Sequence, residues 1–361
     1  MKTLNKTRSL LNEIIERINN KDLDHKALTA AQDRLQNQAK PPGSLGVMEE
    51  IAVRLAAIKG DIDVKLTNKV IVTCAGDHGV VEEGVSLFPA EVTPQMVLNF
   101  AGGGASVNVI ADHAGAAVKA ADIGVNYDFD PKLPIFHKKV RYGTANFTKE
   151  PAMSRSEAVQ SIEAGIDIVN ELEAENAVDL LGTGDMGIGN TTPSTAVIAA
   201  FSGLPVEKLT GRGTGIDDTG LAIKTAVIKK GLALHRPDPA DPLDILSKVG
   251  GLEIGALAGL VLGAASRGIP VICDGLISTA GALIACELAP GAKNYLFSSH
   301  KSVEIGHRYM HDRLGIESLI DLKFCLGEGT GAAVCMELLD LATRILADIK
   351  TFEEVGVTNI K

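Results

Sequence analysis

Residues 182–194, GTGDMGIGNTTPS, decide how this chain folds. A mostly apolar run at 178–181 precedes them and is typical of a short buried strand, and residues 195–201 follow with the pattern of a helix. Pro193 suits the first turn of that helix. A strand that passes through glycines into a helix leaves backbone N–H groups free near the helix N-terminus, and such groups favour a phosphate or a carboxylate. The segment is therefore a candidate anion site.

Two other interpretations of this segment stay open. A glycine-rich turn that only needs positive φ angles has the same composition, and Asp185 in its middle would repel an anion unless it contacts another part of the ligand. Gly182, Gly184 and Gly187 also satisfy the dinucleotide pattern G-x-G-x-x-G of an NAD-dependent oxidoreductase. In that pattern the helix opens at the third glycine, whereas five residues intervene here before the proline. The spacing therefore argues against a dinucleotide.

The composition excludes several classes of partner. With 361 residues, 45% of them hydrophobic, the chain can bury the core of a large α/β domain with or without a small one. A formal charge of −10 without a basic run argues against nucleic acid and anionic membrane, and the longest apolar stretch, 252–265, contains Glu253 and is too short to span a bilayer. The N-terminus lacks a signal-peptide pattern, and the five cysteines form no C-x-x-C pair and are typical of buried thiols. We therefore expect a cytoplasmic protein.

Strand and helix patterns alternate from about residue 69 onward. Strand patterns lie at 69–75, 116–123, 178–181, 269–273 and 294–297, and helical patterns at 94–113, 155–175, 194–201, 218–234, 251–266 and 277–288. This alternation predicts βαβ units and an α/β fold with a mostly parallel, doubly wound sheet.

The two chain ends have helical spacing without strand patterns. It extends over 3–18, 27–38 and 331–349, and Ser44 can cap a further helix at about 45–58. We expect a small helical domain made of residues 1–39 and about 335–361, and a large α/β domain at 40–334.

Almost every predicted strand ends in a glycine-bearing or polar cluster. Such clusters occupy 76–80, 182–194, 274–281 and 298–302, and two more lie at 211–215 and 326–331. Loops at the carboxyl ends of parallel strands gather along one edge of the sheet, where ligands bind. The sequence therefore predicts an active site at this edge.

Several single residues are candidates for contact with a ligand. Glu328 stands between two glycines, so its carboxylate can approach a ligand closely, although it could equally be a solvated loop acid. Asp77 and Asp274 each follow a strand and are either ligand contacts or Asx-type caps. Lys224, on the helix after the 211–215 loop, is either a counter-charge for phosphate or a solvated lysine.

The histidines give no metal-binding pattern. His307 and His311 are four residues apart, but the glutamate of H-E-x-x-H is missing and no cysteine or acid cluster completes a ligand set. We expect no metal and no cofactor. His78, beside Asp77, has a better claim on substrate.

Nine motifs in order resemble the nicotinate-nucleotide:dimethylbenzimidazole phosphoribosyltransferase family. They are KPPGSLG (40–46), AGDHGV (75–80), FPAEVTPQMVLNF (88–100), GDMGIGNTTPS (184–194), GRGTGIDD (211–218), DILSKVGGLEIGALAG (244–259), CDGLISTAGAL (273–283), SSHKSVEIGH (298–307) and LGEGTGAA (326–333). The resemblance implies a Rossmann-like parallel sheet, a small helical domain from both chain ends, and a homodimer with sites near the interface.

The resemblance also implies a reaction and its residues. The phosphoribosyl group of nicotinate mononucleotide would pass to a nitrogen of an aromatic base in cobamide assembly, with Glu328 as the base that removes the azole proton. Phosphate would be held by the amides of 187–191, by Lys224 and by the region of Ser302. The substrate-binding set that the motifs imply comprises Gly187, Asn190, Thr191, Gly213, Lys224, Ser302, Gly331, Asp77, His78, Phe88 and Met96.

Two departures concern the second acid and the acceptor. The family loop usually reads G-E-[ML]-G and its glutamate assists the site, whereas this chain has the shorter Asp185, which we also assign to catalysis. Phe88 and Met96 predict an apolar acceptor pocket, where some relatives have polar side chains. The resemblance therefore leaves open a phenol or p-cresol acceptor, and a low-activity partner subunit in a heterodimer of homologous chains.

Overall fold

A seven-stranded parallel sheet forms the centre of the molecule. The computed structural model describes residues 9–213 and 215–358. The strands are β1 (Lys69–Gly76), β2 (Ala116–Gly124), β3 (Phe136–His137), β4 (Leu180–Met186), β5 (Val271–Cys273), β6 (Leu296–His300) and β7 (Ser318–Ile320). Their order is β3-β2-β1-β4-β5-β6-β7, and every pair is parallel. The direction of strand addition reverses between β1 and β4, where an open α/β sheet leaves a crevice beyond the strand ends.

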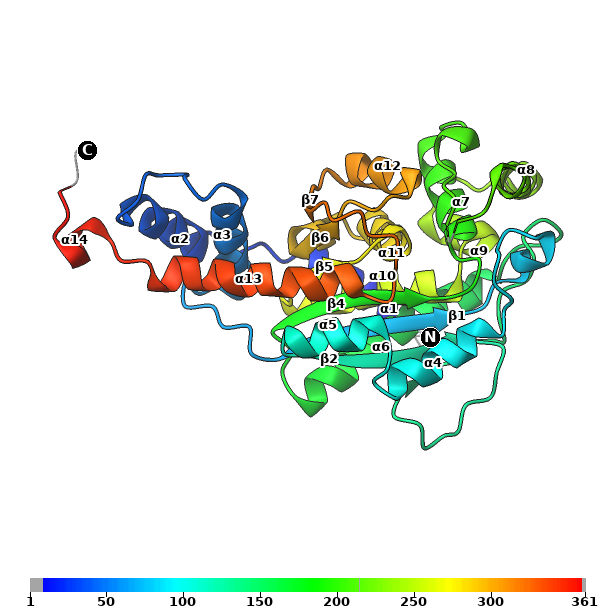
Figure 1. Cartoon of the computed structure of the whole chain (residues 1–361), viewed down its shortest axis with the longest axis horizontal. Helices are drawn as coiled ribbons and strands as arrows, with labels where there is room; N and C mark the ends of the chain where they lie inside the picture. Colours follow the sequence, from blue (N-terminus) through cyan, green and yellow to red (C-terminus); the bar gives the residue numbers. More distant parts are fainter. Residues whose placement is uncertain (1–8, 214, 359–361) are drawn as a thin grey trace, which may run out of the picture.

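Helices cover both faces of this sheet, so the predicted doubly wound α/β fold is confirmed. The helices are α1 (Leu10–Asn19), α2 (His25–Asn37), α3 (Val47–Lys59), α4 (Val92–Ala101), α5 (Ser106–His113), α6 (Arg155–Glu175), α7 (Thr191–Ser202), α8 (Asp218–His235), α9 (Pro242–Val249), α10 (Leu252–Arg267), α11 (Leu276–Leu288), α12 (Ile305–Leu314), α13 (Thr330–Asp348) and α14 (Phe352–Val355). α4, α5 and α13 cover one face, and α10 and α11, with α6 packed on α10, cover the other (Figure 1). α10 is buried from Leu252 to Ser266, which explains its uniformly apolar sequence.

The two chain ends meet at one end of the molecule. α2, α3, α14 and the C-terminal part of α13 lie beyond the sheet (Figure 1). The last carbonyls of α13, which have no partner within the helix, accept hydrogen bonds from α2 instead. Arg34 Nε donates to Leu346 O (2.7 Å), and Gln38 Nε2 donates to Ile345 O (2.7 Å).

The helices near the chain ends pack on different parts of the molecule. α1 packs on α10 and α6, behind the sheet, whereas α3 packs on α2 and α13. The helix predicted at 3–18 begins at Leu10 with Ser9 as its cap, and the part before residue 9 lies outside the described residues. Ser44 does not cap α3; the capping position is Gly46, whose φ of 52° favours glycine.

Three further local predictions were wrong. The loop expected to begin at Gly182 is strand β4 as far as Met186, because this segment pairs with β1 and β5. The short edge strands β3 and β7 were not predicted, and the helix expected at 94–113 is two helices separated by Gly102–Gly104. Among the described residues, no helix is long and apolar enough to cross a membrane.

Candidate active site

A cavity of about 270 Å³ opens beyond the carboxyl ends of β4, β5 and β6. It is lined by Val85, Ser86, Phe88, Val92, Met96, Asp185, Met186, Gly187, Ile188, Gly189, Asn190, Thr191, Arg212, Gly213, Ile216, Gly275, Leu276, Ile277, His300, Ser302, Glu304, Cys325, Leu326, Gly327 and Glu328. Five of the six predicted loops contribute to this lining, so the expected convergence at one edge of the sheet is confirmed.

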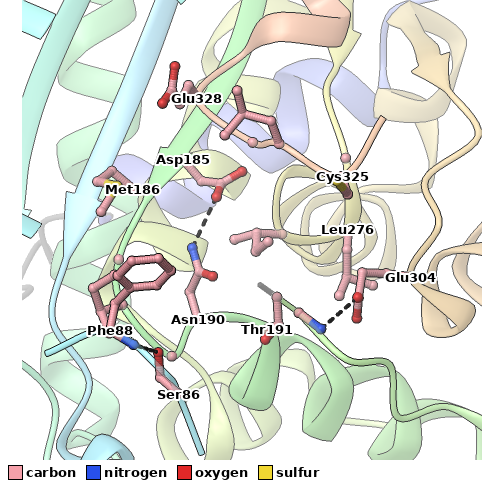
Figure 2. Close-up of a pocket in the computed structure, with 18 of the residues that line it drawn as sticks. Ser86, Phe88, Asp185, Met186, Asn190, Thr191, Leu276, Glu304, Cys325 and Glu328 are labelled. Atoms are coloured by element: carbon pink, nitrogen blue, oxygen red, sulfur yellow. Dashed lines mark hydrogen bonds between the residues drawn. The ribbon is translucent and has the colours of Figure 1, made fainter. Parts of the chain in front are cut away.

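One half of the cavity is apolar. Phe88, Val92 and Met96 come from the segment that leads into α4 and from its first turns, and Met186 and Leu326 face the same space. Figure 2 shows Phe88 and Met186 on the same side of the cavity. Phe88 and Leu326 are exposed, at 47% and 45%. A flat aromatic ligand can stack on the phenylalanine, and methionine side chains adapt to its outline.

The other half is polar and contains free backbone donors. The N–H groups of Gly187, Gly189 and Thr191, at the start of α7, donate no hydrogen bond within the described residues. The remaining two amides of this segment are occupied, since Ile188 N donates to Thr93 Oγ1 and Asn190 N to Gly187 O. Three free N–H groups at a helix N-terminus form a site for an anion.

A buried ammonium group lies beside these amides. Lys224 of α8 is 1% exposed, and its Nζ donates to Thr191 Oγ1 (2.7 Å). Within the described residues no carboxylate lies within ion-pair distance of it. Burial lowers its pKa to about 8, and the nearby charge of Glu304 opposes part of this shift. A buried cation without a direct ion pair is costly, so an anion bound beside this lysine would be stabilised by it.

The carboxylate of Glu304 borders the polar half of the cavity. Glu304 Oε1 accepts a hydrogen bond from Gly213 N (2.8 Å), and Oε2 lies against Gly211, where a Cβ atom would come within 2.1 Å of it. A side chain at position 211 would therefore displace the Glu304 carboxylate. Glu304 was not among the predicted residues, because it lies within a polar loop whose pattern does not distinguish it from a solvated acid.

Asp185 lies near the end of β4, between the two halves. Its Oδ2 accepts a hydrogen bond from Asn190 Nδ2 (3.0 Å), as Figure 2 shows, and its Oδ1 is buried without a partner among the described residues. Burial, reinforced by the charges of Glu253 and Glu328, raises the pKa of Asp185 to about 7. The carboxyl can therefore bind or release a proton near neutral pH.

The backbone of Glu328 is strained and is held by two hydrogen bonds. Its φ is 67°, its carbonyl accepts a hydrogen bond from Thr73 Oγ1 (2.7 Å), and its N–H donates to Asp185 O (3.1 Å). The loop lies directly on β4, since a Cβ at Gly184 would come within 2.1 Å of the Glu328 carbonyl oxygen. A non-glycine residue with positive φ is costly and marks a position that the surrounding structure fixes.

The carboxylate of Glu328 points away from Asp185 (Figure 2). Its Oε2 accepts a hydrogen bond from Val107 N in the first turn of α5 (3.2 Å), and Oε1 has no partner within the described residues. Burial raises the pKa of Glu328, and the bond from Val107 opposes that shift. Glu328 thus has one anchored oxygen and one oxygen available for a proton.

Asp274 fixes the loop that carries Glu328. Its side chain is fully buried at the end of β5 and accepts hydrogen bonds from Gly329 N (3.0 Å), Gly331 N (2.7 Å) and Ala332 N (3.1 Å). These amides belong to the N-terminus of α13 and the turn before it. Asp274 therefore acts as a helix cap, which was one of its two predicted roles. The helix that it caps, α13, is distant in sequence.

Three of the predicted substrate-binding residues, besides Lys224, do not line the cavity, although His78 lies directly against Gly187. Gly331 lies within α13, and Asp77 Oδ2 accepts a hydrogen bond from Asn126 N (2.8 Å). His78 lies behind the glycine loop, where its Nε2 is 3.0 Å from Glu253 Oε1, and both side chains are buried. The charge of Glu253 raises the pKa of His78 against the effect of burial.

Of the three histidines in the C-terminal part of the chain and the five cysteines, some line the cavity and others are buried away from it. His300 lines the cavity, and His307 and His311 lie buried behind it. Cys325 is exposed and lines the cavity, so the expectation of buried thiols holds only for the other four cysteines. Within the described residues, no group of three histidine, cysteine or acidic side chains is arranged to hold a metal ion.

Comparisons with known proteins show the family to which the chain is similar. A phosphoribosyltransferase family model (DBI_PRT) matches residues 20–357. The chain is 58% identical to the nicotinate-nucleotide–dimethylbenzimidazole phosphoribosyltransferase of Citrifermentans bemidjiense, over 93% of this chain and 96% of that one. It is 53% identical to the enzyme of the same name from Chloroflexus aggregans, over 98% and 99% of the two chains.

A solved structure extends the similarity to three dimensions. The crystal structure of the nicotinate-nucleotide–dimethylbenzimidazole phosphoribosyltransferase from Thermus thermophilus superposes with a TM-score of 0.88 at 43% identity. The match covers 93% of this chain and all of the other.

Proposed function

The chain belongs to this phosphoribosyltransferase family, and we propose that it transfers the phosphoribosyl group of nicotinate mononucleotide to 5,6-dimethylbenzimidazole, giving α-ribazole 5′-phosphate and nicotinate for cobamide assembly. The observation that carries this proposal is the division of one cavity into two halves. An apolar half suited to a flat ring adjoins a polar half with free amides and a buried lysine that makes no direct ion pair among the described residues.

The polar half would hold the phosphoribosyl group. The amides of Gly187, Gly189 and Thr191 donate to the phosphate, and Lys224 supplies the opposite charge. Asn190, Gly213 and Ser302 complete the polar lining. A phosphate dianion at this position would form the direct ion pair that the buried ammonium group lacks among the described residues.

The apolar half would hold the acceptor base between Phe88, Met96, Met186 and Leu326. The relatives' names give dimethylbenzimidazole as the acceptor and offer no support for a phenol or for an inactive partner subunit. An apolar pocket matches two ring methyl groups better than a polar one would.

The reaction needs one group to take up a proton. A nitrogen lone pair of the azole forms a bond to the anomeric carbon, and the bond from that carbon to the pyridinium nitrogen breaks. The departing nicotinate nitrogen takes the bonding pair and becomes neutral. The other azole nitrogen loses its proton, and Oε1 of Glu328 is the free carboxylate oxygen at the apolar half. Asp185 lies between the halves, where its carboxylate stabilises positive charge that develops on the sugar.

We further propose the location, oligomeric state and domain organisation that the family resemblance implies. The protein acts in the cytoplasm as a homodimer, with a small helical domain at the joined chain ends. The exposure of Phe88 and Leu326 at the cavity supports a dimer, because a second copy that covers them would close the site. Light scattering after gel filtration tests the oligomeric state.

A direct assay tests the activity. The purified chain is incubated with nicotinate mononucleotide and 5,6-dimethylbenzimidazole, and free nicotinate and α-ribazole 5′-phosphate are measured by liquid chromatography and mass spectrometry. Equal amounts of both products are expected. Hydrolysis of the mononucleotide without a ribotide product contradicts the proposal.

A further inference from the structure

Three buried histidine rings lie next to one another, and one of them, His300, lines the cavity. The ring centroids of His300 and His307 are 6.2 Å apart and those of His307 and His311 are 4.0 Å apart. We propose that His307 is a positioning residue that fixes Ser302 for binding of the substrate phosphate. This inference rests on the proposed function, in which Ser302 contacts the phosphate.

The hydrogen bonds of His307 define its tautomer. The backbone N–H of Ser302 can only donate, and it lies 3.2 Å from His307 Nδ1, so that nitrogen accepts and carries no proton. Nε2 therefore carries the hydrogen, and it donates to Thr279 Oγ1 at 2.9 Å. The imidazole is neutral and joins α11 to the segment before α12.

The Ser302 hydroxyl is oriented by a second hydrogen bond, which it accepts from the backbone that follows it. Ser302 Oγ accepts a hydrogen bond from Glu304 N (3.2 Å), so its own hydrogen must point elsewhere. Within the described residues that hydrogen has no acceptor, and Ser302 lines the cavity. Both donor groups of Ser302 are thereby assigned: the N–H holds the segment on His307, and the O–H is free for an anion.

His307 is itself held on every side. It is 1% exposed, Thr279 fixes one nitrogen, and the ring of His311 packs against it. Burial lowers the pKa of His307 well below its usual value, and the neighbouring rings of His311 and His300 further disfavour a positive charge. The neutral form that accepts from Ser302 therefore persists at neutral pH.

Three substitutions separate this role from ordinary packing. His307→Phe keeps a buried ring but removes both hydrogen bonds. His307→Asn restores an acceptor at the place of Nδ1. His311→Phe is the matched control, because His311 belongs to the same stack but bonds Ser298 and Ser318 instead of Ser302.

The steady-state constants decide the outcome. We expect His307→Phe to raise KM for nicotinate mononucleotide about tenfold, the effect of losing one hydrogen bond to a charged group, and to change KM for the base less than about twofold. We expect His307→Asn to recover most of this loss and His311→Phe to leave KM for the mononucleotide unchanged. An unchanged KM in His307→Phe, or an equal rise in His311→Phe, overturns the inference.

A binding measurement keeps the inference separate from the proposed function. Protection of each variant by inorganic phosphate is followed as the shift in Tm, with wild type as reference. If the wild type shows no transfer, the proposed function fails, but weaker phosphate protection in His307→Phe than in His311→Phe still supports the inference. Equal protection contradicts it. If His307→Phe does not fold, Thr279→Val, which removes the partner of Nε2, takes its place in both measurements.

Discussion

Replacing Asp185 by asparagine should stabilise the protein while it impairs the reaction. Burial and neighbouring acids raise the pKa of Asp185 from 3.8 to about 7. Below about pH 4 the carboxyl is protonated in both the folded and the unfolded chain and contributes nothing. As the pH rises from about 4 to about 7, the unfolded chain loses this proton first, so the folded state becomes less stable; above about pH 7 the full cost remains. A shift of this size corresponds to at most about 4 kcal/mol.

The asparagine variant lacks this charge but keeps an oxygen that can accept from Asn190. Its free energy of unfolding should equal that of wild type near pH 4 and exceed it by a growing margin up to about pH 7, where the difference levels off. Urea unfolding followed by circular dichroism at about pH 4.5, 5.5, 6.5 and 7.5 measures this margin. Asp112→Asn, an exposed acid on α5, is the control and should show no such trend. A margin that is independent of pH, or that has the opposite sign, refutes the reasoning. Transfer activity of the Asp185 variant should fall about 10²-fold.

Three further substitutions test other parts of the site. Glu328→Gln should lower the transfer rate by about 10²–10⁴-fold with binding of nicotinate mononucleotide retained, and a rate near that of wild type in the assay shows that Glu328 is not the base. Lys224→Met should raise KM for the mononucleotide by about 10–100-fold, yet raise Tm below about pH 8, because the lowered pKa means that the buried charge costs stability at those pH values; a lower Tm at neutral pH contradicts this. Gly184→Ala places a methyl group against the Glu328 backbone, so activity should be lost even where circular dichroism shows a folded protein, whereas full activity means that the loop can move away.

The sequence predicted the parts of the structure that have a local pattern. The apolar runs of β1, β2, β4, β5 and β6 and the periodicity of the long helices were sufficient for the fold class. β3 and β7 have two and three residues, so no alternation could reveal them. The glycines around Gly184 are typical of a turn, yet this residue lies in a strand. It is a glycine because the Glu328 backbone crosses β4 there. This contact joins residues 144 positions apart in the sequence, so no local pattern could reveal it.

The site was predictable where its residues share a motif and unpredictable where they meet only through folding. Asp185, Lys224 and Glu328 stand in or after loops whose chemistry suggested a ligand, and the family resemblance pointed to Phe88. All four lie in or beside the cavity. Glu253 looked only like an interruption of an apolar run, yet its charge acts on both Asp185 and His78. An isolated carboxylate in an otherwise apolar helix is a signal that could have identified it.

The long helix α13 connects two distant parts of the molecule. One end of this 19-residue helix follows directly on the loop of Glu328, and the other is clamped by α2 and α3 (Figure 1). At about 1.5 Å per residue the helix is about 28 Å long, so a tilt of about 2° pivoting at the clamp displaces its far end by roughly 1 Å. A displacement of that size at a reacting group can change a rate by about 10²-fold. Asp274 and the packing of α13 on β4 and β6 oppose such a tilt, so the sheet and the joined chain ends together hold the Glu328 loop in place.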